Sequence, residues 1–169
     1  VPSRAKATSA KRLLDNNEEL RNLSDLVIEG RRSSSWKERM DILSDISSIV
    51  CRHMIVLRDS SKLESCLELI LAGLEDGSVK VNLQALQCLH SIHVEVPTLL
   101  PNLQLTVLPA LLKAASSGNR SVGSAAQPVI RDIMSSFALK HVVTQLCHMV
   151  LYEAERLRIT ALKLLAEHV

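Results

Sequence analysis

The sequence predicts an all-α protein in which about four helix pairs stack into an α-solenoid. A helical phrase recurs four times, and each copy has apolar residues at offsets that fall on one helix face. The chain is 47% hydrophobic but contains only three aromatic residues, Trp36, Phe137 and Tyr152. A core of Leu, Ile, Val and Ala without alternating polar and apolar residues favours packed helices over a sheet.

Each copy of the phrase has a register position, occupied in turn by Arg39, Asn82, Gly123 and Arg158. Small or aliphatic residues lie three positions further on, at Ile42, Ala85, Ala126 and Ala161, and aliphatic residues lie seven positions further on, at Ile46, Leu89, Ile130 and Leu165. The copies are roughly forty residues apart, and a period of this length with two helices per unit is typical of HEAT or armadillo repeats. We therefore expect the alanines to be buried at close helix contacts.

The first pair follows a polar, basic segment, residues 1–16, that we expect to be flexible. A helix is predicted over about 17–29, and Gly30 should end it in the left-handed conformation. Ser35 is placed to cap a second helix that starts at Trp36 and ends near Met54.

The later pairs are separated by turns rich in Gly, Ser, Asn and Pro. Ser61 to Glu64 read as a capping box that opens the second pair, and Pro128 should kink a helix of the third. We expect residues 17–169 to form one domain, and we interpret the chain as a fragment of a larger protein. The further helices expected in this domain are 61–74, 78–94, a helix ending at 115, a helix from the turn 116–120 to 136, 139–151 and 155–169.

Stacking brings the turns inside the pairs to one edge of the solenoid, and that edge is rich in basic residues. It should carry Arg31, Arg32, Trp36, Lys37, Lys80, Asn119, Arg120, Arg156 and Arg158. The opposite edge is far less basic, so the sequence predicts an acidic partner at the first edge.

Two of these turns carry a family resemblance. The segment 35–43, with Trp36 at the start of a helix, resembles the opening repeat of TOG domains, which are tubulin-binding HEAT modules, and the turn 75–82 resembles the second. The chain is most similar to the crescerin-type arrays of cilia and to the CLASP proteins. The resemblance implies a monomeric, non-catalytic module of a multi-domain microtubule regulator, located in the cytoplasm on the cytoskeleton, with a cilium or centrosome as the more specific locations.

The resemblance also implies which residues touch αβ-tubulin or the microtubule lattice. Trp36 would be the apolar anchor, and the other contacts would be Lys37, Val79, Lys80, Asn119, Arg120, Arg156 and Arg158. The chain departs from the family at Gly123, where Arg is common, and it has four helix pairs instead of six.

Other interpretations remain open at this point. Trp36 could simply cover the core of a terminal repeat, and Arg39 and Arg158 could bridge neighbouring repeats inside the solenoid. The main alternative function is a HEAT scaffold that binds another protein through its helix faces. An exposed Trp36 would favour the anchor, and a buried Trp36 would favour the scaffold.

Other functional classes find little support in the sequence. A net charge of +2 and three aromatics argue against nucleic-acid binding, and no apolar run is long enough for a membrane span. Scattered Cys and His residues lack the paired spacing of zinc ligands, and no catalytic motif is present, so we expect no metal, cofactor or enzyme activity. Residues 31–35, Arg-Arg-Ser-Ser-Ser, resemble a target of basic-directed kinases.

Overall fold

The computed structural model describes residues 4–58 and 60–168, with side chains from Glu18 to Glu167 within these ranges. These residues form helices joined by short turns, and they contain no strand. The helices are α1 (Arg4–Arg32), α2 (Trp36–Leu57), α3 (Ser61–Gly73), α4 (Val79–Glu95), α5 (Leu99–Asn102), α6 (Gln104–Ala115), α7 (Arg120–Ser135), α8 (Leu139–Tyr152) and α9 (Glu155–His168). The prediction of an all-α fold is therefore confirmed.

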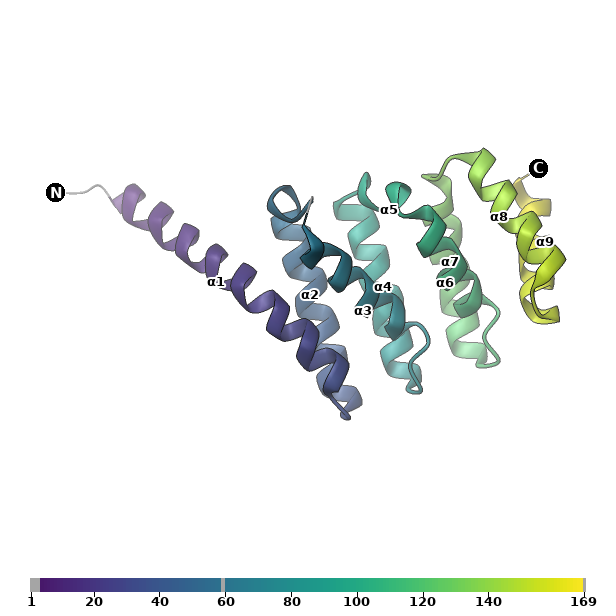
Figure 1. Cartoon of the computed structure of the whole chain (residues 1–169), viewed down its shortest axis with the longest axis horizontal. Coiled ribbons are helices and arrows are strands. Elements are labelled where there is room, and N and C mark those ends of the chain that lie inside the picture. Colours follow the sequence, from purple (N-terminus) through teal and green to yellow (C-terminus); the bar gives the residue numbers. More distant parts are fainter. Residues whose placement is uncertain (1–3, 59, 169) are drawn as a thin grey trace.

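The helices lie in two layers (Figure 1). In one layer α2 contacts α4 and α4 contacts α7, while α1, α3 and α6 cover this row from the other side. The last two helices pack against each other and against α6. The pairs α1–α2, α3–α4, α6–α7 and α8–α9 match the four predicted pairs, with the short α5 added before the third.

The recurring phrase marks the buried face of each second helix, as predicted. Ala85, Ala126 and Ala161 are fully buried. The leucine and isoleucines seven positions after the register residue are also fully buried in the first three copies, whereas Leu165 is only partly buried. Small side chains at the closest contacts allow the helices to approach one another, while the larger ones fill the core.

The first helix differs from the prediction at both ends. It begins at Arg4 instead of near residue 17, so the segment 4–16 is helical; Ala, Lys, Arg and Leu in this segment are strong helix formers. It also continues through Gly30 to Arg32, and no described glycine has a positive φ. A Cβ atom at Gly30 would lie 2.7 Å from Leu69 Cδ2 and 3.0 Å from Ile42 Cγ2, so this glycine permits close packing and does not end the helix.

Two further boundaries also differ. Helix α2 continues past Met54 to Leu57 through a non-helical His53. The N-cap of α3 is Ser60, not Ser61, and it makes no side-chain capping bond, so the predicted capping box is not formed. Local sequence cannot choose between two adjacent serines. Helix α7 runs through Pro128, which lies on its exposed face.

None of the helices in the described ranges combines the length and apolar character needed to cross a bilayer.

Candidate binding edge formed by the turns

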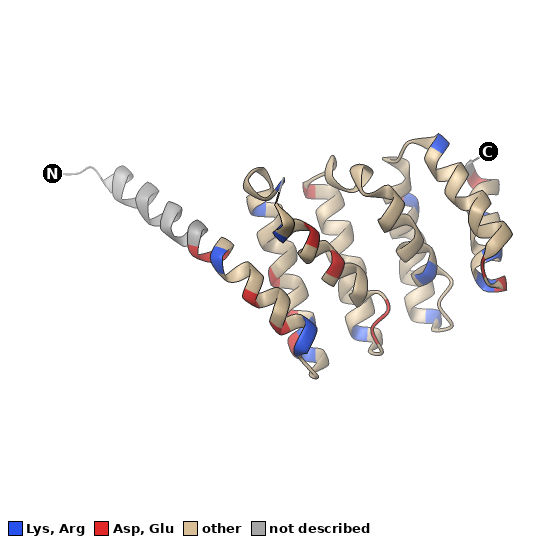
Figure 2. Cartoon of the chain, viewed as in Figure 1, with Lys and Arg blue, Asp and Glu red and all other residues tan. Residues whose placement is uncertain are grey.

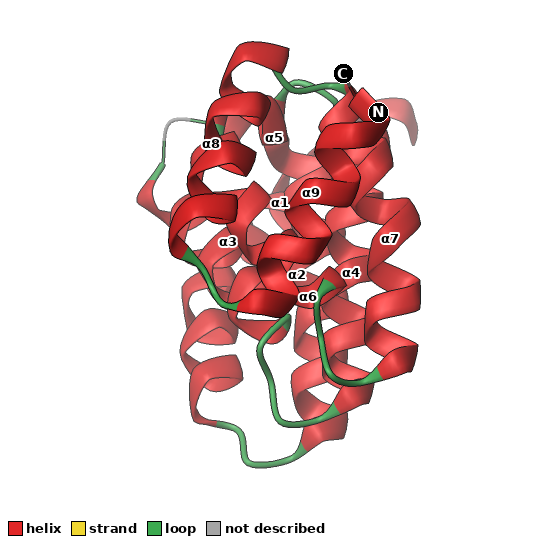
Figure 3. Cartoon of the chain, turned by 90° about the vertical axis from the view of Figure 1, so that its right-hand side faces the viewer, coloured by secondary structure: helices red, strands yellow, loops and turns green. Residues whose placement is uncertain are grey.

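The turns inside the four helix pairs lie at one end of the molecule (Figures 1 and 3). We call this end the turn edge; it consists of the turns 33–35, 74–78, 116–119 and 153–154 together with the first residues of α2, α4, α7 and α9. All eight predicted contact residues belong to it, because each one lies at the N-terminal end of the second helix of a pair. The structure describes each of them with its side chain.

The first two turns meet through Trp36. Ser35 caps α2 as predicted, because its side chain accepts a hydrogen bond from the Glu38 N–H at 3.5 Å. This cap places Trp36 at the first position of α2, where its ring packs partly against the core. The Lys80 ammonium of the next pair lies 4.0 Å from the ring centroid, and that of Lys37 lies 5.6 Å away.

This arrangement is a cation–π contact between neighbouring pairs, of a kind that stabilises by about 0.5–1 kcal/mol at exposed sites. Trp36 is half-buried. Its exposure is thus intermediate between the two alternatives that the sequence left open, an exposed anchor and a buried core residue. Lys80 is exposed, and Val79 beside it packs partly into the core. Lys80 is thus the more exposed of these two predicted contact residues.

Arg39 bridges the first and second turns from inside. Its guanidinium donates two hydrogen bonds to Asp76, at 2.8 and 2.9 Å, and a third to the Ser33 carbonyl at 3.1 Å. Both side chains of the ion pair are largely shielded, at 22% exposed for Arg39 and 15% for Asp76. The interpretation of Arg39 as a bridge between repeats is confirmed.

The charge state of Asp76 follows from these contacts. Burial raises its pKa, but hydrogen bonds from Arg39 and from the Ser78 N–H, together with the positive charge of Arg39, outweigh burial and hold the pKa below its usual range. Asp76 is therefore ionised at neutral pH and links the loop before α4 to the first pair.

Asn82 organises the second turn in a way that the sequence did not reveal. Its buried amide nitrogen lies within hydrogen-bonding distance of the carbonyl oxygens of Gly73 at 2.9 Å, Leu74 at 3.1 Å and Asp76 at 2.9 Å. These carbonyls belong to the end of α3 and the following turn, where no helical partner is available. The signal for this role was an amide side chain at the register position, where the other copies have Arg or Gly.

At the third turn the same register position serves close backbone packing. A Cβ atom at Gly123 would lie 3.3 Å from the Ala115 carbonyl oxygen, so α7 approaches the end of α6 directly. Asn119 is the N-cap of α7, and its side chain accepts hydrogen bonds from the N–H groups of Ser121 and Val122. Arg120 is exposed and forms no ion pair with any described residue. Of these two predicted contacts, Arg120 is free to bind a partner while Asn119 has a capping role.

The fourth turn supplies two exposed arginines. Arg156 reaches back to the third turn, where its Nη1 atom lies 2.8 Å from the position that a Cβ of Gly118 would occupy. Arg158 has no ion pair within the described ranges, so the bridge proposed for this register position is absent here. Both side chains add positive charge to the edge.

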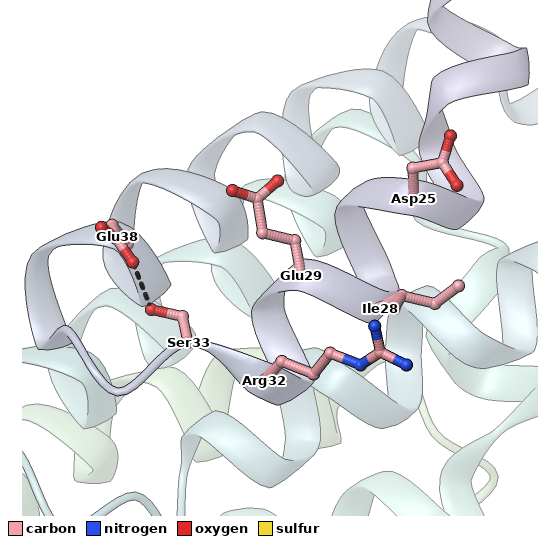
Figure 4. Close-up of a pocket in the computed structure, with 6 residues that line it drawn as sticks. All are labelled: Asp25, Ile28, Glu29, Arg32, Ser33 and Glu38. Carbon is pink, nitrogen blue, oxygen red and sulfur yellow. Dashed lines mark hydrogen bonds between the residues drawn. The ribbon is translucent and has the colours of Figure 1, made fainter.

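The turn edge is not uniformly basic (Figure 2). Asp76 is neutralised by Arg39, and Glu75 pairs with Lys113 of α6 at 3.1 Å. A shallow pocket beside the first turn is lined by Asp25, Glu29 and Glu38 as well as by Arg32 (Figure 4). At and beside the turn edge, the cations without an ion pair to a described residue are Arg32, Lys37, Lys80, Arg120, Arg156 and Arg158. The exposed acids Glu38, Glu153 and Glu155 also have no such pair, so the accessible charge of the edge is mixed, with a small positive excess.

The described side chains contain no cluster of three or more His, Cys, Asp or Glu residues that could hold a metal ion. The free cysteines are Cys51, Cys66, Cys88 and Cys147, and burial raises the pKa of Cys66 to about 11, which keeps it a protonated thiol. The pocket in Figure 4 is lined mostly by charged and polar side chains, which are common at the solvent-exposed end of a helix.

In comparisons with known proteins, no family model and no curated protein matches this sequence. The edge must therefore be interpreted from its own geometry.

Proposed function

We propose that this chain is a HEAT-repeat solenoid of the TOG type that binds αβ-tubulin or the microtubule lattice through its turn edge, without catalysing a reaction. The observation that carries the proposal is the contact of the exposed Lys80 with the half-buried Trp36, which joins an ammonium and an aromatic ring from two neighbouring turns at the edge. The TOG resemblance implies an acidic surface on tubulin, and the accessible charge of the turn edge has a small positive excess. In this function the chain acts on the cytoskeleton, as one module of a larger microtubule regulator.

The geometry suggests how such an edge would bind. The Trp36 ring limits the motion of the Lys80 side chain, so less conformational entropy is lost when Lys80 meets a carboxylate. Arg120, Arg156 and Arg158 extend the positive charge along the later turns. Interactions of this exposed kind govern the association rate and weaken as salt is added.

Charge reversal at two turns tests the proposal. Lys80→Glu combined with Arg120→Glu should weaken binding by roughly tenfold or more, which corresponds to about 1.4 kcal/mol. Both side chains are exposed and lack ion pairs to described residues, and the substitution of Lys80 removes only its contact with Trp36, worth about 0.5–1 kcal/mol, so the melting temperature should fall by only a few degrees. Binding is measured by co-sedimentation with microtubules and by co-elution with αβ-tubulin on a sizing column.

The matched control reverses the same number of charges away from the edge. Lys140→Glu at the opposite edge, combined with Lys163→Glu within α9, replaces two exposed lysines and should leave binding at the parental level. Equal loss in both double variants would point to bulk charge and contradict an edge-specific interface. An unmodified protein that binds neither tubulin nor microtubules would rule out the proposed function. Truncation of Trp36 is less informative, because its ring also packs on the core.

A groove favours the scaffold as a second candidate. It runs between α3 and the α5–α6 segment, and the nearly fully exposed Ile55 lies at its margin. Its apolar lining consists of Leu63, Leu67, Leu71, Leu99, Leu103 and Val107. A partner held there would lose affinity on Ile55→Lys and would be indifferent to the double substitution at Lys80 and Arg120.

A further inference from the structure

The three serines of the first turn have different environments. The Ser33 hydroxyl donates a hydrogen bond to Glu38 at 2.6 Å (Figure 4), and its oxygen also accepts from the Ser35 N–H at 3.2 Å. Ser35 caps α2 and is partly buried. Ser34 is exposed, and its hydroxyl forms no hydrogen bond within the described part of the chain. Only Ser34 is therefore chemically free.

The residues before Ser34 are basic at two consecutive positions. Arg31 and Arg32 stand three and two residues ahead of it, and both are exposed. Arg32 has no ion pair with a described residue, and Arg31 is held only by a solvent-exposed pair with Glu68 at 2.9 Å. Exposed pairs of this kind contribute about 0–1 kcal/mol, so both guanidinium groups are available to an acidic recognition site.

We propose that Ser34 is a phosphorylation site for a basic-directed serine kinase. In the transfer, Ser34 Oγ attacks the γ-phosphorus of ATP, the bond from that phosphorus to the oxygen bridging the β- and γ-phosphates breaks, ADP leaves, and the hydroxyl proton passes to the kinase's base. The kinase recognises Arg31 and Arg32 through its own carboxylates.

The fold allows the local opening that a kinase needs. Arg31 and Arg32 form the end of α1, where helices fray at little cost, and the outermost bond, from the Ser33 N–H to the Glu29 carbonyl, is the first to break. Opening is limited at Gly30, which is buried against Leu69 and Ile42. The turn can therefore extend from Arg31 onward while the first pair stays packed.

Phosphate at Ser34 would change the charge of the turn edge next to Trp36. It adds about two negative charges at neutral pH, enough to offset the unpaired Arg32 and Lys37. An acidic partner would then meet a neutral or negative first turn. This consequence rests on the proposed function, whereas the modification itself does not.

Phosphorylation is tested on the folded protein with ATP, Mg²⁺ and the catalytic subunit of cAMP-dependent protein kinase, followed by intact-mass measurement and peptide mapping. The expected result is one phosphate, located on Ser34. Ser34→Ala should abolish it and Ser33→Ala should preserve it. Arg32→Gln should slow it by roughly tenfold or more, because recognition loses one charge. A folded protein that stays unmodified, or that carries its phosphate on Ser33 or Ser35, would overturn the assignment.

The effect on binding is measured separately with the phosphorylated protein and microtubules. Phosphate should weaken co-sedimentation by roughly tenfold or more through like-charge repulsion. If phosphorylated and unmodified protein bind equally, the regulatory role fails. If the unmodified protein does not bind at all, the proposed function fails while the Ser34 assignment is decided by the mass measurement alone.

Discussion

Two arginines show how the surroundings of a residue decide its role. Arg39 and Arg158 hold the same register position in their helices. Arg39 finds Asp76 in the next pair and makes a bidentate ion pair with it, largely shielded from solvent. Arg158 is exposed and pairs with no described acid. The first is structural, and the second is available to a partner.

We predict that Arg39→Met destabilises the protein and that Arg158→Met does not. Met keeps most of the apolar stem but removes the guanidinium, which leaves the Asp76 carboxylate shielded with only the Ser78 N–H as a donor. The free energy of unfolding should fall by about 1–3 kcal/mol. At Arg158 the change should stay within about 0.5 kcal/mol. Urea unfolding followed by circular dichroism measures both, and equal effects would contradict the distinction.

Small residues set the distances between helices. Ala85, Ala126 and Ala161 are fully buried at the same place in three successive pairs. Gly30 and Gly73 lie where a Cβ would come within about 3 Å of side chains on neighbouring helices. The spacing of the helices therefore depends on which side chains are absent as much as on which are present.

Enlarging one of these residues should strain the packing. Ala126→Leu inserts a large side chain at a site without free space, and we expect a loss of about 1–3 kcal/mol in the free energy of unfolding. Ser124→Leu adds the same side chain to an exposed position of α7 and serves as the control. Thermal unfolding of both variants checks the prediction, and an Ala126→Leu protein as stable as the control would show that the site can expand.

At the scale of the whole molecule, polar contacts link helices that are distant in sequence. Ion pairs join Arg31 to Glu68, Arg39 to Asp76, Lys113 to Glu75 and Arg131 to Glu167. Only the second is largely shielded from solvent. The others contribute little individually, so the apolar layer between the helices supplies most of the stability.

Acid should weaken the whole molecule through two carboxylates. A hydrogen bond with His53 lowers the pKa of Glu19, with Arg52 adding to the effect, and the pKa of Asp76 is also below its ordinary value. Groups with depressed folded-state pKa values stabilise the fold above their unfolded pKa and lose that contribution as pH falls through the folded value. The melting temperature should therefore decrease between about pH 5 and about pH 2.

Arg39→Met separates the contribution of Asp76 from that of Glu19. The variant should show a shallower decline in melting temperature over the acid range, because without Arg39 the pKa of Asp76 is no longer depressed and this carboxylate has no stabilising contribution to lose. A parent protein whose melting temperature is constant across this range would contradict the assignment of both carboxylates.

The sequence by itself determined the eight helices of the four pairs, apart from their exact ends, together with the pairing and the faces that are buried. Periodic apolar residues and polar turns are local signals, and they placed Ala126 in the core and Ser35 at a helix cap without knowledge of any distant contact. They also placed seven of the eight candidate residues on the turn edge, because the start of a helix is a local property, while Val79 was added by the TOG resemblance.

Only the tertiary structure decided what those residues touch. The contact of Lys80 with Trp36, the pairing of Arg39 with Asp76 and the close packing at Gly30 each join residues far apart in the chain. The sequence predicted Gly30 as a helix end, since glycine is locally typical of one, but its neighbours Ile42 and Leu69 come from other helices. Such contacts depend on how helices stack, and stacking is set by the summed packing of many side chains and not by any single local pattern.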